Sequence, residues 1–513
     1  MGGFRSRSES ARSGEGQRKK ATGYQQRRPE HKQRKSRSRG SGDKVRDVVF
    51  GVLRDVTVDG AFGNLALPKA LREAGIKGRD AAFATELTYG TLRARGLLDA
   101  IIEDAAGRKI ERIDSVALDA LRLGAYQILR TRVENHAAVN TSVELVKAFG
   151  AGQASGFVNG VLRALTRKKP ETWVERVAPG DSLADLALRN AHPEWIAEVF
   201  AEALGVDTAT DAGRAELERA LAADDARPIV HLAARPGQIS GEELALITGG
   251  TEGKFSPYAV YLDEGAPGEI APVREGMASV QDEGSQLIGL ATTRIPVAAD
   301  LPARWLDLCA GPGGKTAFIA SVAMSEQASV DAIEIAEHRA KLIEQTTRDL
   351  PVRVHVGDGR NLEAIGSLEA PEGGFARVLI DAPCSGLGAL RRRPEARWTK
   401  DPQDVAPLVT LQRELLISGL EATAPGGVVI YSTCSPHPKE TSEVVRSVSA
   451  RTGAEILDVT QFLPELAETN TAQTSPFVQL WPHIHGTDAM SFAALRPASN
   501  STGTNTSTNT SQE

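Results

Sequence analysis

The second half of the chain alternates strand-like and helix-like segments, and this alternation restricts the possible folds more than any other feature. Five short apolar segments, with helical patterns between most of them, occupy residues 304–308, 330–334, 352–356, 378–381 and 428–432. This order predicts a mostly parallel sheet covered by helices on both faces, a Rossmann-like α/β domain. Ligands of such sheets bind at the carboxyl ends of the strands, so the residues after each segment are the candidates for a functional site.

The rest of the 513-residue chain differs in character from this part. The region before residue 170 repeats apolar side chains at helical spacing, which predicts a compact all-helical bundle. The next hundred residues or so mix strand-like pieces, at 229–233 and 259–262, with many Gly and Pro, which predicts a small α+β connecting module. The predicted order is a disordered basic arm (1–42), the helical bundle (43–170), the connecting module (171–277), the α/β domain (278–497) and a disordered tail (498–513).

Charge is distributed unevenly along the chain. Residues 1–42 carry 13 Lys or Arg against 3 Asp or Glu, whereas the remaining residues carry 47 against 63. The basic arm can neutralise nucleic-acid phosphates or serve only as a solubilising tail, and the sequence leaves both open. The acidic body counts against an RNA enzyme unless basic residues cluster around its cleft.

Cysteine is rare, and its three positions are informative. Cys309, Cys384 and Cys434 each follow a predicted strand, so we expect all three at one edge of the sheet. An odd number forms no disulfide framework, and neither CxxC spacing nor a four-ligand zinc set accompanies them. The sequence shows no secretory signal and no apolar run of membrane-spanning length. It therefore predicts a cytoplasmic protein with reduced thiols, no metal and no membrane contact.

The segment WLDLCAGPGGKT, residues 305–316, joins a strand to a helix through a glycine loop. Backbone N–H groups in such a loop can bind a polar or anionic ligand. A P-loop would need glycine where Cys309 stands, and a dinucleotide-binding loop would need another spacing of the glycines. The adenosyl-cofactor loop of a methyltransferase remains, with Glu334 at the end of the next strand as the partner of ribose hydroxyls. A purely structural turn is the alternative.

Two further segments follow strands. Asp358 lies in VGDGRN, where its carboxylate can reach an adenine amino group, although Asp-Gly is also an ordinary turn pair. The segment LIDAPCSGLGALRRRPEARW, residues 379–398, places Asp381 and Cys384 on either side of Pro383 and continues into four arginines. The carboxylate can pair with a base edge and the arginines can hold phosphates, with a solvated charged loop as the alternative for the arginines.

Cys434 ends the last predicted parallel strand, in YSTCSPHPKE. A lone cysteine at a strand end is usually a small buried hydrophobe, but two thiols beside a cofactor loop favour a catalytic pair. Carbon 5 of a pyrimidine is a poor nucleophile until a thiolate adds to carbon 6, so methylation there calls for a cysteine. The base must be unstacked or presented in a loop, and a second thiol can assist release.

Together these segments resemble the Sun/Fmu (RsmB-like) RNA cytosine-C5 methyltransferases. The resemblance rests on LDLCAGPGGKT, GDGR, DAPCSGLGALRRRPEARW and YSTCSPHPKE, with SVQDEGSQL (279–287) and AHPEWI (191–196) upstream. It covers most of residues 43–497, and residues 43–170 resemble the NusB-like RNA-binding domain of bacterial members. It implies S-adenosylmethionine as cofactor and 16S ribosomal RNA as substrate, unassembled or partly assembled into the small subunit.

The resemblance also implies roles for individual residues. Cys434 is the expected nucleophile and Cys384 the release thiol, although DNA cytosine methyltransferases use a Pro-Cys nucleophile, which would select Cys384. Asp381 and Lys315 complete the expected catalytic group. The expected cofactor-binding residues are Cys309, Ala310, Gly311, Pro312, Gly313, Gly314, Lys315, Glu334, Asp358 and Asp381.

The chain departs from the family pattern in two places. Gly311 stands where alanine is usual, and Lys439-Glu440-Thr441 replaces the common Glu-Glu-Asn, which leaves open how the loop after Cys434 is held. The sequence thus predicts a 16S rRNA (cytosine-C5)-methyltransferase. A transfer RNA methyltransferase of the same chemistry is the nearer alternative, and a non-catalytic RNA-binding or transcription-regulating protein acting through the helical bundle is the alternative of another class.

Overall fold

The computed structural model describes residues 40–263, 265, 267–469 and 476–498. The predicted basic arm and tail therefore lie almost wholly outside the described residues. No helix within the described ranges is long and apolar enough to cross a membrane.

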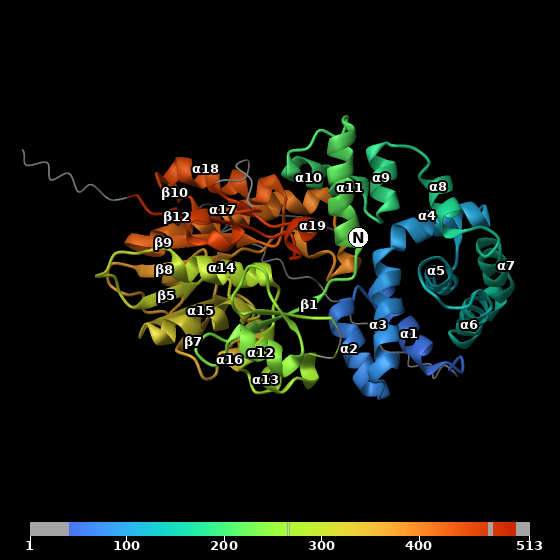
Figure 1. Cartoon of the computed structure of the whole chain (residues 1–513), viewed down its shortest axis with the longest axis horizontal. Helices are drawn as coiled ribbons and strands as arrows, with labels where there is room; N and C mark the ends of the chain where they lie inside the picture. Colours follow the sequence, from blue (N-terminus) through green and yellow to red (C-terminus); the bar gives the residue numbers. More distant parts are fainter. Residues whose placement is uncertain (1–39, 264, 266, 470–475, 499–513) are drawn as a thin grey trace, which may run out of the picture. The chain divides into compact units, whose positions relative to one another are not determined.

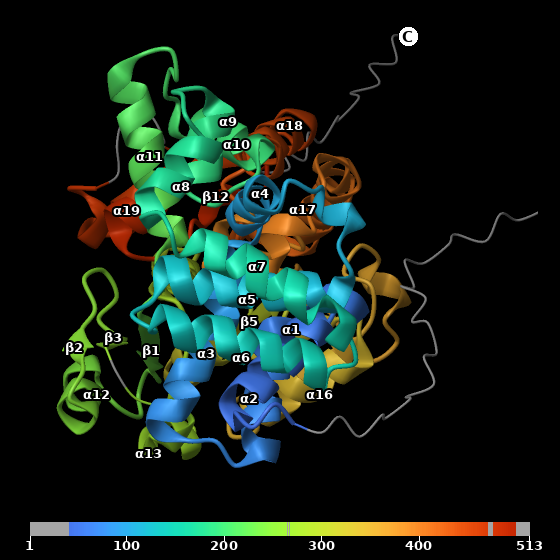
Figure 2. The same ribbon diagram turned by 90° about the vertical axis from the view of Figure 1, so that its right-hand side faces the viewer.

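The described chain opens with a helical bundle, as predicted (Figure 2). Asp43 caps the first helix by accepting a hydrogen bond from the N–H of Arg46, and Gly60 ends that helix in the left-handed conformation. Apolar side chains at helical spacing, such as Val49 and Leu53, form the core of the bundle. The helices are α1 (Lys44–Asp59), α2 (Gly63–Ala74), α3 (Gly78–Arg93), α4 (Arg95–Ala106), α5 (Ser115–Arg130), α6 (Asn135–Ala148) and α7 (Ser155–Leu165).

A connecting region of helices and a small sheet follows. Its helices are α8 (Pro170–Val177), α9 (Leu183–Arg189), α10 (Glu194–Leu204), α11 (Asp211–Asp225), α12 (Gly241–Thr248) and α13 (Ala271–Arg274). Its strands are β1 (Val230–Ala234), β2 (Thr251–Glu252), β3 (Ala259–Leu262) and β4 (Ala278–Val280), paired antiparallel in the order β2-β3-β1-β4. The strand-like pieces predicted at 229–233 and 259–262 are β1 and β3. Strand β4 begins at residue 278 and pairs with β1, so the small sheet extends past the predicted module boundary at residue 277. That boundary stays a prediction.

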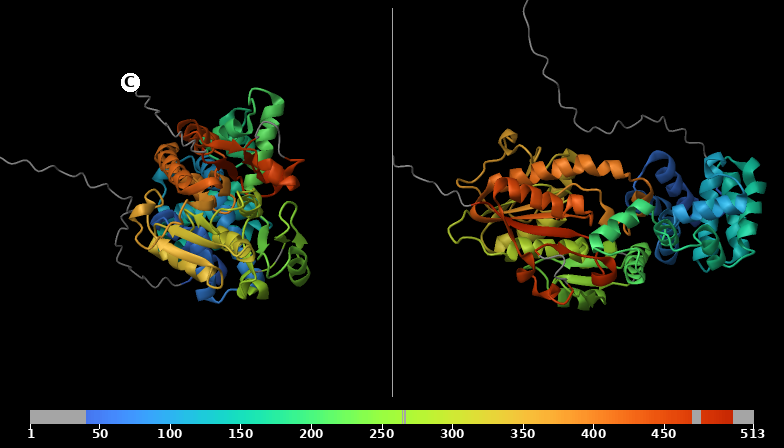
Figure 3. Two further views of the ribbon diagram at one scale, coloured as in Figure 1. Left: turned by 90° about the vertical axis from the view of Figure 1, so that its left-hand side faces the viewer. Right: turned by 90° about the horizontal axis from the view of Figure 1, so that it is seen from above.

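The α/β domain is built on the predicted parallel sheet. Its strand order is β10-β12-β9-β8-β5-β6-β7, with β11 paired to β12, and the run from β9 to β7 is parallel (Figures 1 and 3). The parallel strands are β5 (Arg304–Asp307), β6 (Ser329–Glu334), β7 (Val352–Val356), β8 (Phe375–Asp381) and β9 (Thr423–Thr433). The antiparallel strands, which the sequence reasoning did not predict, are β10 (Glu455–Leu457), β11 (Val478–Gln479) and β12 (Ser491–Arg496).

Alternate residues of the strands enter two separate cores, one on each face of the sheet. Trp305 and Leu379 pack with α14 and α15, whereas Leu306 and Val378 pack with α17 and α18. Both faces are therefore buried, which explains why the strands are continuously apolar. The helices are α14 (Glu283–Arg294), α15 (Gly314–Ser325), α16 (Glu337–Thr346), α17 (Val405–Ala422), α18 (Ser442–Thr452) and α19 (Pro482–His485).

Candidate active site

Two glycines shape the loop between β5 and α15. Gly313 has a left-handed φ of 107°, and a Cβ there would lie 3.1 Å from the Cα of Ile343. The N–H of Gly311 donates to the Glu334 carboxylate over 3.2 Å. A Cβ at Gly311 would lie 2.2 Å from that carboxylate, so the departure from alanine leaves room for Glu334 against the loop backbone.

A cavity of about 240 Å³ lies against this loop. The predicted site residues that line it are Cys309, Ala310, Gly311, Pro312, Gly314, Lys315 and Asp381. Lining residues that were not predicted are Val280, Gln281, Asp282, Ser285 and Asp307. The cavity thus lies at the carboxyl ends of β5 and β8, the edge where the parallel sheet is expected to bind a ligand.

Three predicted cofactor residues do not line the cavity. Gly313 forms the turn of the loop. Glu334 is 4% exposed and is occupied by the N–H groups of Gly311 and Ala336 and by an ion pair with Arg339. Asp358 is held by the guanidinium of Arg360, which lowers the pKa of Asp358. Contacts of Glu334 and Asp358 with a cofactor therefore stay predictions.

The two cysteines after β8 and β9 lie side by side. These strands pair in parallel, with Asp381 opposite Ser432, and the sulfur atoms of Cys384 and Cys434 are 3.3 Å apart. A hydrogen bond from Cys384 lowers the pKa of Cys434 against the effect of burial, and the positive charges of Lys315 and Arg393 also lower it. The same hydrogen bond, burial and the negative charges of Cys434, Glu440 and Asp381 raise the pKa of Cys384. Cys434 is therefore the member of the pair that ionises first.

Cys309 follows β5 at the same edge of the sheet but is not part of this pair. It lines the cavity, and burial raises its pKa, with further contributions from the charges of Asp307 and Asp381. Its thiol is thus harder to ionise than that of Cys434.

Lys315 and Asp381 connect the cofactor loop to the cysteine pair. The Nζ atom of Lys315 lies 2.8 Å from Oδ2 of Asp381, whose Oδ1 accepts a hydrogen bond from the hydroxyl of Ser432. Lys315 lies in the first turn of α15 and Ser432 lies on β9. The two predicted residues are therefore brought together, between the cavity and Cys434.

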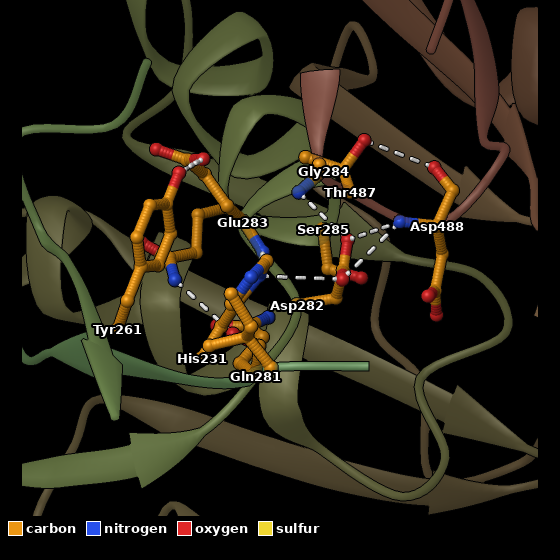
Figure 4. A network of polar contacts seen from close by, with 12 residues as sticks. His231, Tyr261, Gln281, Asp282, Glu283, Gly284, Ser285, Thr487 and Asp488 are labelled. Carbon is orange, nitrogen blue, oxygen red and sulfur yellow. Dashed lines mark hydrogen bonds and ion pairs between the residues drawn. The ribbon is translucent and has the colours of Figure 1, made fainter. Parts of the chain in front are cut away.

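Asp282, which the sequence reasoning missed, lies at the centre of a buried polar network (Figure 4). It caps α14 by accepting from the N–H of Gly284, accepts from the N–H of Asp488, and lies 3.4 Å from His231 of the small sheet. Arg392 donates to it over 2.7 Å. Its only sequence signal was its place in SVQDEGSQL. The network fixes one wall of the cavity to the small antiparallel sheet.

Neither of the two expected roles, phosphate binding or a solvated charged loop, applies to three of the four arginines after Cys384. Arg391 and Arg392 pair with Asp282 and Asp488, so they are neither phosphate ligands nor part of a solvated loop. Arg397 is fully buried and pairs with Asp224 and Asp225 near the end of α11. Arg393 is exposed and forms no ion pair among the described residues. A run of arginines in a sequence gives no sign that carboxylates far away in the chain will form ion pairs with them.

Two neighbours of these arginines join the helical bundle to the α/β domain. The indole N–H of Trp398 donates to the carbonyl of Arg93 over 3.0 Å, and the carboxylate of Glu395 accepts from the N–H of Gly63. We name residues 391–398 the arginine segment. It contacts the bundle, the connecting helices and the cavity wall.

Glu440 holds the loop after Cys434 in place, which answers the question that the sequence left open. Its buried carboxylate accepts hydrogen bonds from Ser385 and Ser435, the residues that directly follow the two cysteines. The cysteine motifs gave no signal for this contact, because Glu440 reaches a loop more than fifty residues away.

The cavity lining suits a positively charged adenosyl cofactor. Carboxylates of Asp282, Asp307 and Asp381 line it, and Oδ1 of Asp307 is buried without a hydrogen-bond partner among the described residues. Asp282 and Asp381 are already paired with arginine and lysine side chains. Asp307 is therefore the lining carboxylate that can compensate the positive sulfonium or ammonium group of S-adenosylmethionine. Within the described part of the chain, no group of three or more His, Cys, Asp or Glu is arranged to hold a metal.

The chain is similar in sequence to proteins named as methyltransferases and in fold to a solved structure. The family model described as 16S rRNA methyltransferase RsmB/F matches residues 297–496, and the NusB family model matches residues 43–167. A putative methyltransferase of Mycobacterium tuberculosis is 53% identical over 458 residues, covering 88% of this chain and 96% of the relative. The crystal structure of PH0851 shares the fold, with a TM-score of 0.70 at 19% identity over 88% of this chain and 98% of that one.

Two further relatives bear ribosomal names. The ribosomal RNA small subunit methyltransferase B of Klebsiella pneumoniae is 34% identical, covering 74% of this chain and 83% of its own length. The probable ribosomal RNA small subunit methyltransferase B of Bacillus subtilis is 29% identical, covering 88% of this chain and 98% of its own. This chain therefore belongs to the RsmB/F family of 16S rRNA methyltransferases, with an N-terminal NusB-like domain and S-adenosylmethionine as methyl donor.

Proposed function

We propose that this protein methylates carbon 5 of a cytosine in 16S ribosomal RNA through a covalent bond between Cys434 and carbon 6. The observation that carries the proposal is the 3.3 Å separation of the Cys434 and Cys384 sulfur atoms beside the cofactor cavity. Methylation of an exocyclic oxygen or nitrogen needs no thiol, whereas carbon 5 needs a nucleophile at carbon 6. The ribosomal names of the Klebsiella and Bacillus relatives support the RNA substrate.

The reaction follows from the charges around the two thiols. The Cys434 thiolate adds to carbon 6, and the electron pair of the carbon 5–carbon 6 bond becomes available at carbon 5. Bound S-adenosylmethionine supplies the methyl group that carbon 5 takes up. A base then removes the proton of carbon 5, the ring double bond re-forms and Cys434 leaves as thiolate. Cys384 assists this release by donating its hydrogen bond to the departing sulfur.

The remaining predicted residues position these groups. The backbone of the loop from Cys309 to Lys315 holds the cofactor, with Glu334 and Asp358 contacting its ribose and adenine. Lys315 favours the thiolate of Cys434, and Asp381, held by Lys315, contacts the cofactor or the cytosine. The RNA is presented as free or partly assembled small-subunit RNA in the cytoplasm.

The test is denaturing gel electrophoresis after incubation of Cys384→Ala and Cys434→Ala with S-adenosylmethionine and unmodified small-subunit RNA. We expect a covalent protein–RNA adduct with Cys384→Ala and none with Cys434→Ala. The reverse pattern would assign the attack to Cys384. Absence of 5-methylcytosine in RNA treated with the unsubstituted protein would refute the proposal.

Two other functions give different outcomes in the same assay. A transfer RNA methyltransferase would form 5-methylcytosine in transfer RNA and leave small-subunit RNA unmodified. A non-catalytic RNA-binding or regulatory protein would keep its biological activity in the Cys434→Ser variant. The close cysteine pair beside the cavity favours the enzyme over the second of these alternatives.

A further inference from the structure

Glu440 is a buried carboxylate with no cationic partner among the described residues. It is fully buried, six residues after Cys434, in the short 3₁₀ turn Pro438–Glu440 that leads to α18. Removing a carboxylate from water is costly unless hydrogen bonds replace the lost solvation. A charge at this position therefore requires an explanation from its surroundings.

Donors from three different segments satisfy this carboxylate. Oε1 accepts from the N–H of Ser385 over 2.7 Å and from the side-chain amide of Gln412 on α17 over 3.1 Å. Oε2 accepts from the hydroxyl of Ser435 over 2.7 Å and from the hydroxyl of Ser385. The amide of Gln412 also donates to the carbonyl of Pro383, the residue before Cys384. One carboxylate thus links the residues on both sides of Cys384 to the residue after Cys434.

The charges around the two thiols are also distributed unequally. Glu440 is among the negative groups that act on Cys384, whereas the positive groups Lys315 and Arg393 act on Cys434. The negative charge of Asp381 acts on both thiols and does not distinguish them. The negative group on one side and the positive groups on the other raise the pKa of Cys384 relative to that of Cys434.

We propose that Glu440 is a positioning residue that sets the separation of the two cysteine loops and keeps the shared proton on Cys384, so that Cys434 is the thiol that attacks. The roles of attack and release rest on the proposed function. The placement of the proton does not, because it can be measured on the thiols without RNA.

The first test measures the alkylation of each cysteine by iodoacetamide against pH, with the modified residues identified by mass spectrometry at low extents of reaction. The variants are Glu440→Gln and, as a control, Glu443→Gln, which removes an exposed carboxylate nearby in the chain. In Glu440→Gln we expect the pH midpoint of Cys384 alkylation to fall by about half a unit to one unit, because a nearby negative charge is lost. We expect no change at Cys384 in the control.

Cys309 reports on the integrity of the fold in the same experiment. It is partly exposed, lines the cavity and forms no hydrogen bond with Glu440 among the described residues, so its alkylation should be equal in all variants if the domain is intact. If Cys309 reacts faster in Glu440→Gln, the Glu440→Asp variant replaces it, because Asp keeps the charge but shortens the reach. The midpoint of Cys384 should then stay high. An unchanged Cys384 midpoint in a folded Glu440→Gln variant would overturn the proposal.

The second test measures the reaction with RNA. In Glu440→Gln one carboxylate oxygen becomes an amide NH₂ group that cannot accept, so the hydrogen bonds made to that oxygen are lost. This loss should lower kcat and leave KM for RNA unchanged, with more covalent adduct at steady state than in the unsubstituted protein. A raised KM with unchanged kcat would contradict the positioning role. If the unsubstituted protein forms no 5-methylcytosine, the proposed function fails, and the alkylation midpoints still decide the role of Glu440.

Discussion

Asp307 is a cavity residue whose ionisation depends on the fold around it. Burial, together with the negative charge of Asp381, raises its pKa from 3.8 to about 7 although it accepts a hydrogen bond from Thr316. The folded chain therefore holds an extra proton between these two pH values. The stabilising contribution of this group is present below about pH 4 and is lost as the pH rises through about 7.

We predict that the affinity for S-adenosylmethionine falls as the pH is lowered below about 7, by up to tenfold per unit. The cationic cofactor favours the ionised form of Asp307, and protonation removes that attraction. Asp307→Asn should flatten this dependence. Calorimetric titration between about pH 5.5 and 8.5 measures it, with the exposed Asp300→Asn as control. An equal pH dependence in Asp307→Asn and the unsubstituted protein would contradict the prediction.

Arg393 is a second residue for which the fold suggests a role. Its three arginine neighbours in the segment are covered by carboxylates, and it is exposed and close enough to Cys434 to lower the pKa of that thiol. Arg393 forms no ion pair within the described part of the chain, so its guanidinium near Cys434 is placed to meet a phosphate of a bound RNA.

We predict that Arg393→Gln weakens RNA binding and reduces the slope of log Kd against log salt by about 0.7 to 0.9, the loss of one phosphate contact. Filter binding of small-subunit RNA to the Cys434→Ser background, over a series of salt concentrations, gives the slope. Arg451→Gln, an exposed arginine at the end of α18, is the charge-matched control. Equal slopes for both variants would show that Arg393 makes no contact with an RNA phosphate.

At the scale of elements, the arginine segment is held by buried ion pairs. Arg397 and Asp224 are both fully buried, and Arg397 also donates to the carbonyl of Ala191 over 3.0 Å. Removing one partner of a buried pair leaves an uncompensated charge, which costs more than the pair itself contributes.

We therefore expect Arg397→Met to lower the free energy of unfolding by about 3–5 kcal/mol. Urea denaturation measures this change. Arg393→Met, four residues earlier and exposed, should change stability by less than about 0.5 kcal/mol. Adding Asp224→Asn to Arg397→Met should recover part of the loss, because it removes the stranded charge. No recovery would point to packing rather than charge as the source of the loss.

At the scale of the whole molecule, Trp398 ties the bundle to the catalytic domain. A Cβ at Gly96 on α4 would lie 2.1 Å from its indole ring, so only glycine admits this contact. The segment that follows Cys384 therefore lies directly against the helical bundle. Movement of the bundle would be transmitted to the loop that carries Cys384.

We expect Gly96→Ala to lower the free energy of unfolding by about 1–3 kcal/mol, because the added methyl group displaces Trp398 from the bundle. Thermal unfolding should then divide into two calorimetric transitions. Gly156→Ala on α7, where no atom lies within 4 Å of the added Cβ, is the matched control. It should unfold in one transition and gain up to about 1 kcal/mol from helix propensity. A single transition at unchanged temperature for Gly96→Ala would show that the contact does not couple the domains.

Local sequence patterns suffice to predict the parallel sheet, the helical bundle and the edge where the cysteines and the glycine loop meet. These depend on local periodicity and on the rule that parallel strands share their carboxyl ends, so neighbouring residues carry the information. The antiparallel strands β10 to β12 escaped prediction because such short segments gain their identity from the partner strand.

The charges within the site, in contrast, depend on the three-dimensional fold. The pairing of three arginines with distant carboxylates, the capture of both cysteine loops by Glu440 and the raised pKa of Asp307 all depend on residues far apart in the chain. The energy of a charge depends on its burial and on which opposite charges or donors face it. A sequence names the ionisable groups, and the fold decides which of them remain free to act on a substrate.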